Sequence, residues 1–208
     1  IPSEQIGIWS MHESMAKSFP LSIFINKIGF FLFGQDVLST RKILTIFSVI
    51  SLTTFYLLSR KFFSQLISLL VTLLYSFSTY KLITTRIPVP HSYNDIFLYL
   101  ALFFLVHAMA TSKKVKYLLL VFSGSLFTLG LFIYNLAYIT PLIGLGFIFF
   151  QFFLKKKSWK EIILIMIFFL LPIISFLPQI IHSFNLERKR KNYALEHVVF
   201  DYKKKQFR

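Results

Sequence analysis

The chain has 208 residues, of which 56% are hydrophobic and only 15% are charged, whereas a soluble domain of this size carries about 25% charged residues. Its formal net charge is +15, but the basic residues gather at the ends of apolar runs, which is typical of a membrane protein and not of a nucleic-acid-binding surface. There is no cysteine, so disulfides, thiolate catalysis, cysteine-ligated zinc and iron–sulfur clusters are excluded.

Residues 1–40 precede the first uncharged run, and we expect them to form an external or interfacial segment that contains one surface helix. Apolar residues recur at helical spacing from Ile23 onwards, while Asn26 and Lys27 are polar. An apolar stripe opposite polar residues suits a helix that lies in the membrane interface. Pro20 can begin this helix and Gly34 can end it. A short tilted span is the alternative interpretation of the same residues.

Five long stretches without a formal charge follow. A helix needs about 20 mostly apolar residues to cross a bilayer, so the stretch 117–154 is long enough for two crossings. Apolar residues at consecutive positions favour helices over barrel strands, whose apolar positions alternate. The sequence therefore predicts an all-α membrane protein, a polytopic helix bundle over 41–182. The expected spans, about six, lie near residues 42–60, 62–80, 95–112, 117–136, 138–154 and 160–181.

Clusters of lysine and arginine at 60–61, 113–116 and 155–160 fall on one side if these spans alternate in direction. Because cytoplasmic loops carry the excess of basic residues, we expect this side to be cytoplasmic. The external side then holds Arg41, Lys42, Lys81 and Arg86. The basic tail 183–208 is expected to begin an external loop, since long segments translocate largely regardless of charge. A cytoplasmic tail is the alternative, and it requires that one expected span does not cross.

Arg86, His91 and Asp95 cluster between two expected spans. Ionisable groups at a membrane edge are candidate functional sites, and an arginine can make two parallel contacts to a phosphate. Asp95 can orient Arg86, bind a sugar hydroxyl or bind a metal ion. The alternative is that Arg86 only anchors a span end and Asp95 caps the next helix. His91 is expected in a solvated loop.

Tyr134, Asn135 and Tyr138 make the turn inside the double-length run polar. Hydroxyl-bearing aromatic side chains suit a sugar or lipid-phosphate pocket, but they equally suit an interfacial aromatic belt, which we favour. His107 stands alone within a span and is expected to be a hydrogen-bonded histidine inside the bundle. The sequence has no glycine-rich phosphate loop and no zinc-type histidine spacing, so no metal-binding residue is assigned.

The order of these landmarks resembles that of GT-C membrane glycosyltransferases, and more narrowly the bacterial family related to protein O-mannosyltransferases and lipid A aminoarabinose transferases. The similarity begins with "SFPLSIFINKIGFFLFGQDVLSTRK", which looks like the family's interfacial helix and the start of its next span. Further matches are "YLLSRKFF", "TTRIPVPHSYNDIFLYL" and "GLFIYNLAYITPL". The residues that carry the resemblance are Pro20, Leu21, Phe33, Gly34, Arg41, Tyr56, Leu57, Arg60, Phe63, Arg86, Asp95, Gly130, Leu131, Tyr134, Pro141 and Leu142.

The resemblance implies a hexosyl- or pentosyltransferase in a bacterial plasma membrane. It would move a sugar from a polyprenyl-phosphate donor to a lipid or protein acceptor on the external face, with Arg86 and Asp95 near the donor phosphate. It also implies a divalent ion, magnesium or manganese, in the full-length protein. The family's catalytic aspartate precedes the interfacial helix. Glu4 and Glu13 are the acids before Pro20 and neither matches, so we expect an internal fragment whose catalytic acid lies upstream.

Two other classes of protein fit the same layout. A transporter or flippase of lipid-linked glycans would show internal repeats and broken helices near the membrane midplane. The sequence has no visible internal repeat. A membrane subunit without chemistry of its own is the third hypothesis, and no catalytic residue is assigned within the chain.

Overall fold

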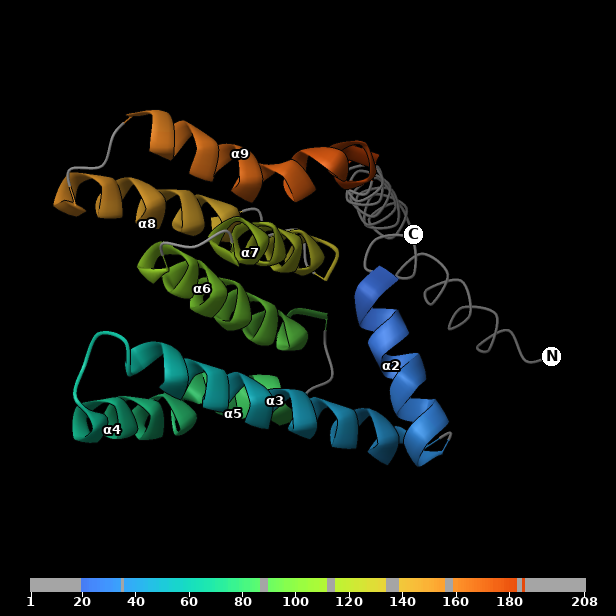
Figure 1. Cartoon of the computed structure of the whole chain (residues 1–208). Helices are drawn as coiled ribbons and strands as arrows, with labels where there is room; N and C mark the ends of the chain where they lie inside the picture. The colour runs from blue at the N-terminus through green and yellow to red at the C-terminus, as the bar shows by residue number, and fades with distance from the viewer. Residues whose placement is uncertain are drawn as a thin grey trace, which may run out of the picture.

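The computed structural model describes residues 20–34, 36–86, 90–111, 115–133, 139–155, 159–182 and 185, and within them it contains helices and turns but no strand. This confirms the prediction of an all-α helix bundle. Most of the helices run alongside one another, and α2 lies across one end of this bundle (Figure 1). The helices are α2 (Pro20–Phe33), α3 (Val37–Ser59), α4 (Gln65–Ser76), α5 (Thr79–Arg86), the 3-10 turn η1 (Pro90–Tyr93), α6 (Asn94–Ala110), α7 (Val115–Leu131), α8 (Ile139–Lys155) and α9 (Trp159–Ser175).

Helix α2 has the two bounds that Pro20 and Gly34 predict. Gly34 adopts φ 92°, a left-handed conformation that favours glycine, and its N–H donates to the carbonyl of Phe30 at 3.0 Å. The helix crosses the end of α3 instead of running antiparallel along it, which is the arrangement expected of a surface helix (Figure 1).

The sequence groups Asn26 with Lys27 opposite an apolar stripe, and in the structure Lys27 is exposed whereas Asn26 is turned towards the bundle. Asn26 is only partly exposed, and its side-chain oxygen accepts a hydrogen bond from the hydroxyl of Tyr93. Ser22 and Ile25 are buried on the same side, while Phe24 and Phe31 are exposed. Burial raises the pKa of Tyr93 to about 12, so its hydroxyl remains a donor at neutral pH. This hydrogen bond stabilises the orientation in which Asn26 faces the bundle.

Helix α3 is the one described helix that is long and apolar enough to cross a membrane by length and composition, over Leu38–Ser59. The 17-residue helices α6 and α7 reach only about 25 Å at 1.5 Å per residue, against a hydrocarbon core of about 30 Å. The count of six spans therefore stays a prediction.

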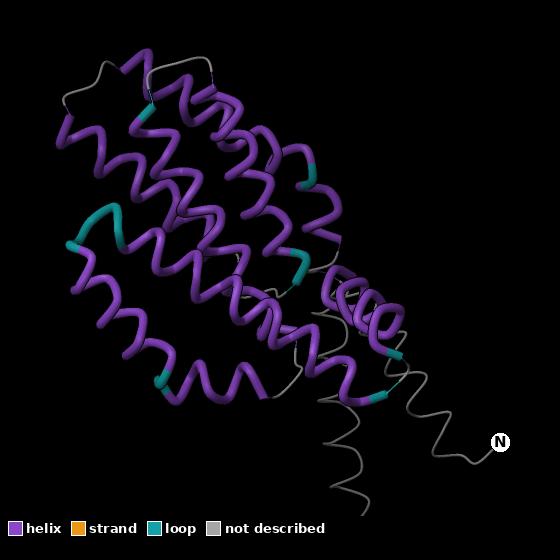
Figure 2. Tube along the Cα trace, turned by 60° about the horizontal axis from the view of Figure 1, so that its bottom comes forward, coloured by secondary structure: helices purple, strands orange, loops and turns teal. Residues whose placement is uncertain are grey.

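The stretch 62–80, expected as one span, is divided between α4 and α5. The chain bends at Phe77 and Ser78, as Figure 2 shows at the edge of the bundle. The hydroxyl of Ser78 accepts the backbone N–H of Lys81 at 3.2 Å and so caps α5. The hydroxyl of Ser78 also donates to the carbonyl of Tyr75 at 2.7 Å. The bend therefore satisfies its own polar groups, as apolar surroundings require.

Contacts along α3 give the relative directions of its neighbours. The ring of Tyr75 lies 4.8 Å from Phe55, and Lys81 Nζ lies 3.0 Å from the hydroxyl of Ser51, so α4 and α5 run antiparallel to α3. The ring of Tyr99 in α6 also lies near Phe55, at 5.1 Å. Because Asp95 precedes Tyr99 and lies at the level of Ser51, α6 runs in the same direction as α3.

The main core lies where α6, α7, α8 and α9 meet. Its fully buried residues include Leu105, Leu120, Phe127, Ile148, Ile165 and Phe169. Gly124 lets α7 approach the backbone of α9, because a side chain at this position would strike the carbonyl oxygen of Phe169. Ser123 donates a 2.7 Å hydrogen bond to the carbonyl of Ala101, which joins α7 to α6. Small residues and such hydrogen bonds are typical of helix packing in membranes.

Candidate functional site

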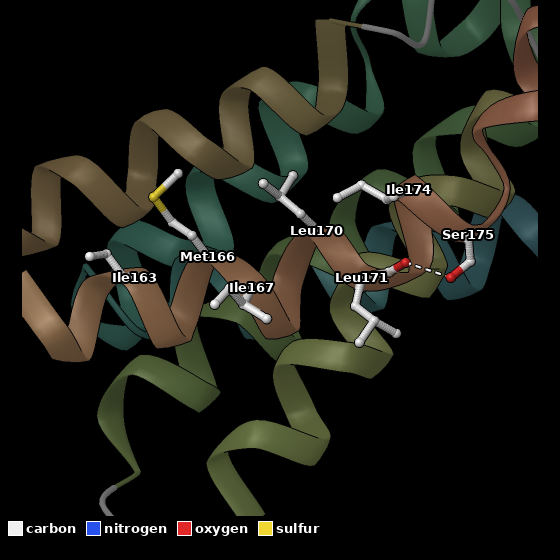
Figure 3. A pocket seen from close by; sticks show the side chains of 7 residues that line it. All are labelled: Ile163, Met166, Ile167, Leu170, Leu171, Ile174 and Ser175. Carbon is white, nitrogen blue, oxygen red and sulfur yellow. Dashed lines mark hydrogen bonds between the residues drawn. The ribbon is translucent and has the colours of Figure 1, made fainter.

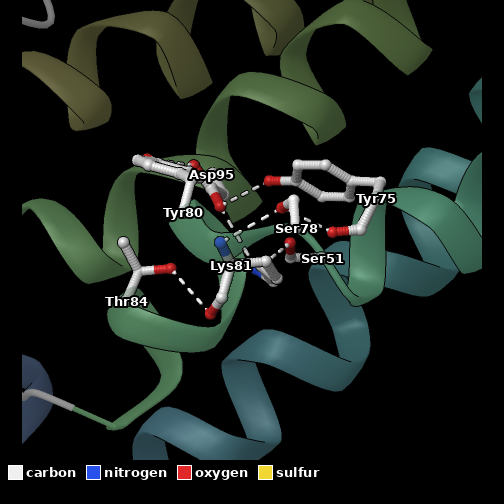
Figure 4. A network of polar contacts seen from close by, with 7 residues as sticks. All are labelled: Ser51, Tyr75, Ser78, Tyr80, Lys81, Thr84 and Asp95. Carbon is white, nitrogen blue, oxygen red and sulfur yellow. Dashed lines mark hydrogen bonds and ion pairs between the residues drawn. The ribbon is translucent and has the colours of Figure 1, made fainter.

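Asp95 lies in the first turn of α6, and only 5% of it is exposed. Three side chains donate hydrogen bonds to its carboxylate (Figure 4). The hydroxyl of Tyr75 and the ammonium of Lys81 donate to Oδ2 at 2.8 Å and 3.2 Å. The hydroxyl of Tyr80 donates to Oδ1 at 3.1 Å. Both oxygens of this carboxylate are therefore hydrogen-bonded within the bundle.

Lys81 is as deeply buried as its partner, with 3% of the residue exposed. Its ammonium also donates to the hydroxyl of Ser51 and lies 5.7 Å from the centre of the Tyr75 ring. Removing a charge from water is costly unless the charge is paired and hydrogen-bonded. Each of the two buried charges is therefore stabilised by the other. Their hydrogen bonds join residues of α3, α4, α5 and α6.

The bend after α4 is what allows two tyrosines to reach one carboxylate. In an uninterrupted helix with 3.6 residues per turn, positions 75 and 80 would lie about 140° apart around the axis. The break at Ser78 reorients α5, and both hydroxyls then converge on Asp95 (Figure 4). The rings of Phe55 and Tyr99 pack against Tyr75 at 4.8 Å and 5.9 Å between ring centroids. The ion pair therefore has an aromatic wall on one side.

The structure describes only some of the predicted site residues. Arg86 is the last residue of α5, but its side chain lies outside the described part of the chain, as does that of His91 in η1. Tyr134, Asn135 and Tyr138 lie outside the described residues altogether.

Asp95 is the one predicted site residue whose side chain is described, and it pairs with Lys81. It does not cap α6, whose N-cap residue is Tyr93. His107, expected inside the bundle, is exposed and stacks on Phe103, with ring centroids 6.2 Å apart.

Sequence reasoning missed the partners of Asp95. Lys81 was counted only as an external charge, and Ser51, Tyr75 and Tyr80 were not singled out. A usable signal was present: a lysine ends one uncharged run and an aspartate begins the next. Burying either charge alone is expensive, so their positions at two adjoining span ends favoured a pair.

A divalent metal ion does not fit at Asp95. Among the described residues, no group of three or more His, Asp or Glu side chains could hold a metal ion. Asp95 contributes a single carboxylate whose oxygens both accept hydrogen bonds, and the adjacent ammonium of Lys81 repels a second cation. This pair therefore offers no site for a divalent metal ion.

An open apolar groove of about 460 Å³ runs along α9 (Figure 3). Its lining is aliphatic apart from Met166 and Ser175, and the hydroxyl of Ser175 donates to the carbonyl of Leu171 at 2.8 Å. The one polar side chain of this lining, Ser175, is thus already hydrogen-bonded to the backbone. Exposed apolar residues also cover α4, where Leu66 and Leu74 are 67% and 73% exposed. Such surfaces suit contact with lipid.

Within the described residues, helices with widely exposed apolar side chains and one helix long enough to cross a bilayer are typical of an integral membrane protein. Its family follows from the match of residues 17–182 to the family model described as dolichyl-phosphate-mannose-protein mannosyltransferase. This match covers most of the chain, so the chain belongs to that family of membrane glycosyltransferases. The match also confirms the GT-C resemblance of the sequence. No curated protein and no solved structure matches the chain significantly.

Proposed function

We propose that the chain is part of a glycosyltransferase that moves a sugar from a polyprenyl-phosphate donor to an acceptor on the external face of a bacterial plasma membrane. The observation that carries the proposal is the family match over residues 17–182. The sugar in this proposal is a hexose or a pentose. Family membership favours this activity over a transporter of lipid-linked glycans and over a subunit without chemistry.

Arg86 is the residue that we assign to the donor phosphate. The phosphate is charged throughout the reaction, and its charge grows as the glycosidic bond to the sugar breaks. A cation held in place before the reaction stabilises that developing charge without reorganising. Arginine suits this role because its planar group makes two parallel hydrogen bonds to phosphate oxygens. Its position at the end of α5, close in sequence to the rigid ion pair, supports the assignment.

Two further parts of the proposal rest on the resemblance. Tyr134, Asn135 and Tyr138 line a pocket for the sugar or the lipid phosphate in this proposal. A magnesium or manganese ion binds in the full-length protein through residues other than Asp95, since that carboxylate is already hydrogen-bonded and paired with Lys81.

The test is transfer of labelled sugar from a polyprenyl-phosphate donor in membranes that carry the full-length protein. Arg86→Ala should lower the rate about 100–1000-fold, the usual loss when one such electrostatic donor is removed. Arg86→Lys should recover part of the rate. Arg60→Ala, an exposed arginine at the opposite end of the neighbouring helices, is the matched control and should transfer normally.

Two results would contradict the proposal. Transfer by Arg86→Ala at the unmutated rate would make Arg86 a membrane anchor only. Movement of intact lipid-linked glycan across vesicle membranes, without transfer of sugar, would favour a transporter.

A further inference from the structure

We propose that Lys81 and Asp95 act as a positioning pair that fixes the segment bearing Arg86, and that Asp95 touches neither the donor nor a metal ion. The proposal rests on the proposed function, because it concerns how the donor-phosphate residue is held. It changes the role that the sequence suggested for Asp95 from ligand contact to support through Lys81.

Lys81 and Asp95 are both buried. The side chains of Lys81 and Asp95 are 3% and 7% exposed, so neither offers a surface that a lipid phosphate or a sugar can reach. Tyr80 donates to Oδ1 of Asp95 and is itself half-exposed, so it separates the carboxylate from the surroundings of the bundle. A ligand would have to displace this tyrosine and enter beside the lysine.

Arg86 lies on the chain segment that the ion pair spans. The ion pair joins residues 14 positions apart, and Arg86 lies between them. Lys81 and Arg86 belong to the same helix, about 7.5 Å apart along its axis at 1.5 Å per residue. The ion pair therefore fixes residues on both sides of Arg86 in the sequence.

Helix α5 is too short to be stable by itself. It has eight residues, and isolated helices shorter than about 12–15 residues are marginal. Its described polar anchors to other helices are the bonds of Lys81 to Ser51 and Asp95 and that of Tyr80 to Asp95. Loss of the ion pair should consequently let the end of α5 move, and a misplacement of about 1 Å at a reacting group can cost about 100-fold in rate.

The experiment compares Asp95→Asn, Lys81→Met and the double variant in the full-length protein, with sugar transfer and protein accumulation both measured. Each single variant leaves one buried charge without its partner, so we expect losses of about 100-fold in transfer. The double variant removes both charges, and replacement of a whole buried pair is often tolerated. We expect it to transfer within about tenfold of the unmutated rate. A double variant as inactive as Asp95→Asn would overturn the proposal, because it would mean that the carboxylate itself serves the reaction.

A second measurement does not depend on activity or on the tolerance of charge removal. Ser51→Cys is a small change beside Lys81 in a chain that has no other cysteine. In a full-length protein whose remaining cysteines are replaced, this thiol should resist a water-soluble maleimide, whereas Tyr80→Cys should react. Rapid labelling at position 51 would show an open, ligand-accessible site and would also overturn the proposal. If the unmutated protein transfers no sugar, the proposed function fails, while the labelling result still decides whether the pair is closed.

Discussion

Gly124→Ala should destabilise the bundle by separating α7 from α9. The added methyl group would lie well inside van der Waals contact with the carbonyl oxygen of Phe169 and 3.3 Å from Cδ of Pro172. A backbone atom cannot rotate away, so one helix must shift. Overpacking of this kind costs about 1–3 kcal/mol, and more where backbone must move. The better helix propensity of alanine returns up to about 1 kcal/mol, which leaves a net loss of up to about 2 kcal/mol.

The matched control is Gly146→Ala in α8, where an added methyl group meets nothing within 4 Å. This variant should gain up to about 1 kcal/mol from helix propensity alone. The propensity gain is common to both variants, so they should differ by the overpacking cost of about 1–3 kcal/mol, which corresponds to about 2–12 °C in melting temperature for a chain of this size. Thermal unfolding of the detergent-purified protein, followed by circular dichroism, measures the difference. Equal melting temperatures for the two variants would refute the close packing of α7 on α9.

Two further predictions concern α2 and the direction of α3. Tyr93→Phe removes the hydroxyl that donates to Asn26, so the protein should lose about 1 kcal/mol of stability. Helix α2 should then become more susceptible to proteolysis. Unchanged cleavage would mean that this hydrogen bond does not hold the helix. Cysteines at Asp36 and Lys61, both exposed and at opposite ends of α3, should label from opposite sides of intact cells, and labelling from one side would contradict the topology. Ser92 is a poorer position for the external label because it is buried.

The fold was predictable where local chemistry decides it. Pro20 and Gly34 predict the bounds of α2 because proline suits a first helical turn and glycine suits the left-handed residue that follows a helix. The absence of charge over long stretches predicts helices in the same way. These signals need no knowledge of what lies beside a segment.

The features that could not be predicted depend on partners far along the chain. The sequence shows Asn26 only as a polar residue opposite an apolar stripe, because its hydrogen-bond partner Tyr93 lies 67 residues away. The bend at Ser78 carries neither glycine nor proline. It places Lys81 beside Ser51, 30 residues earlier, and such pairings leave no local pattern in one sequence.

The broken segment nonetheless agrees with the alternating topology. Residues 65–86 together could reach about 33 Å as a straight helix, which is close to one membrane crossing. Tyr75 contacts Phe55 of α3, and Lys81, further along the segment, contacts Ser51, which lies nearer the start of α3. Tyr93 then packs on Phe47, nearer still to that start, with ring centroids 5.6 Å apart. The chain therefore returns towards the end of α3 near which α2 lies, before α6 reverses its direction. In the predicted six-span topology this segment is one crossing made of two short helices, and the pair of Lys81 with Asp95 ties the second of them to the start of the next helix. After the break, the same ion pair holds α5 against α3 and α6, and Arg86 lies between its two charges in the sequence.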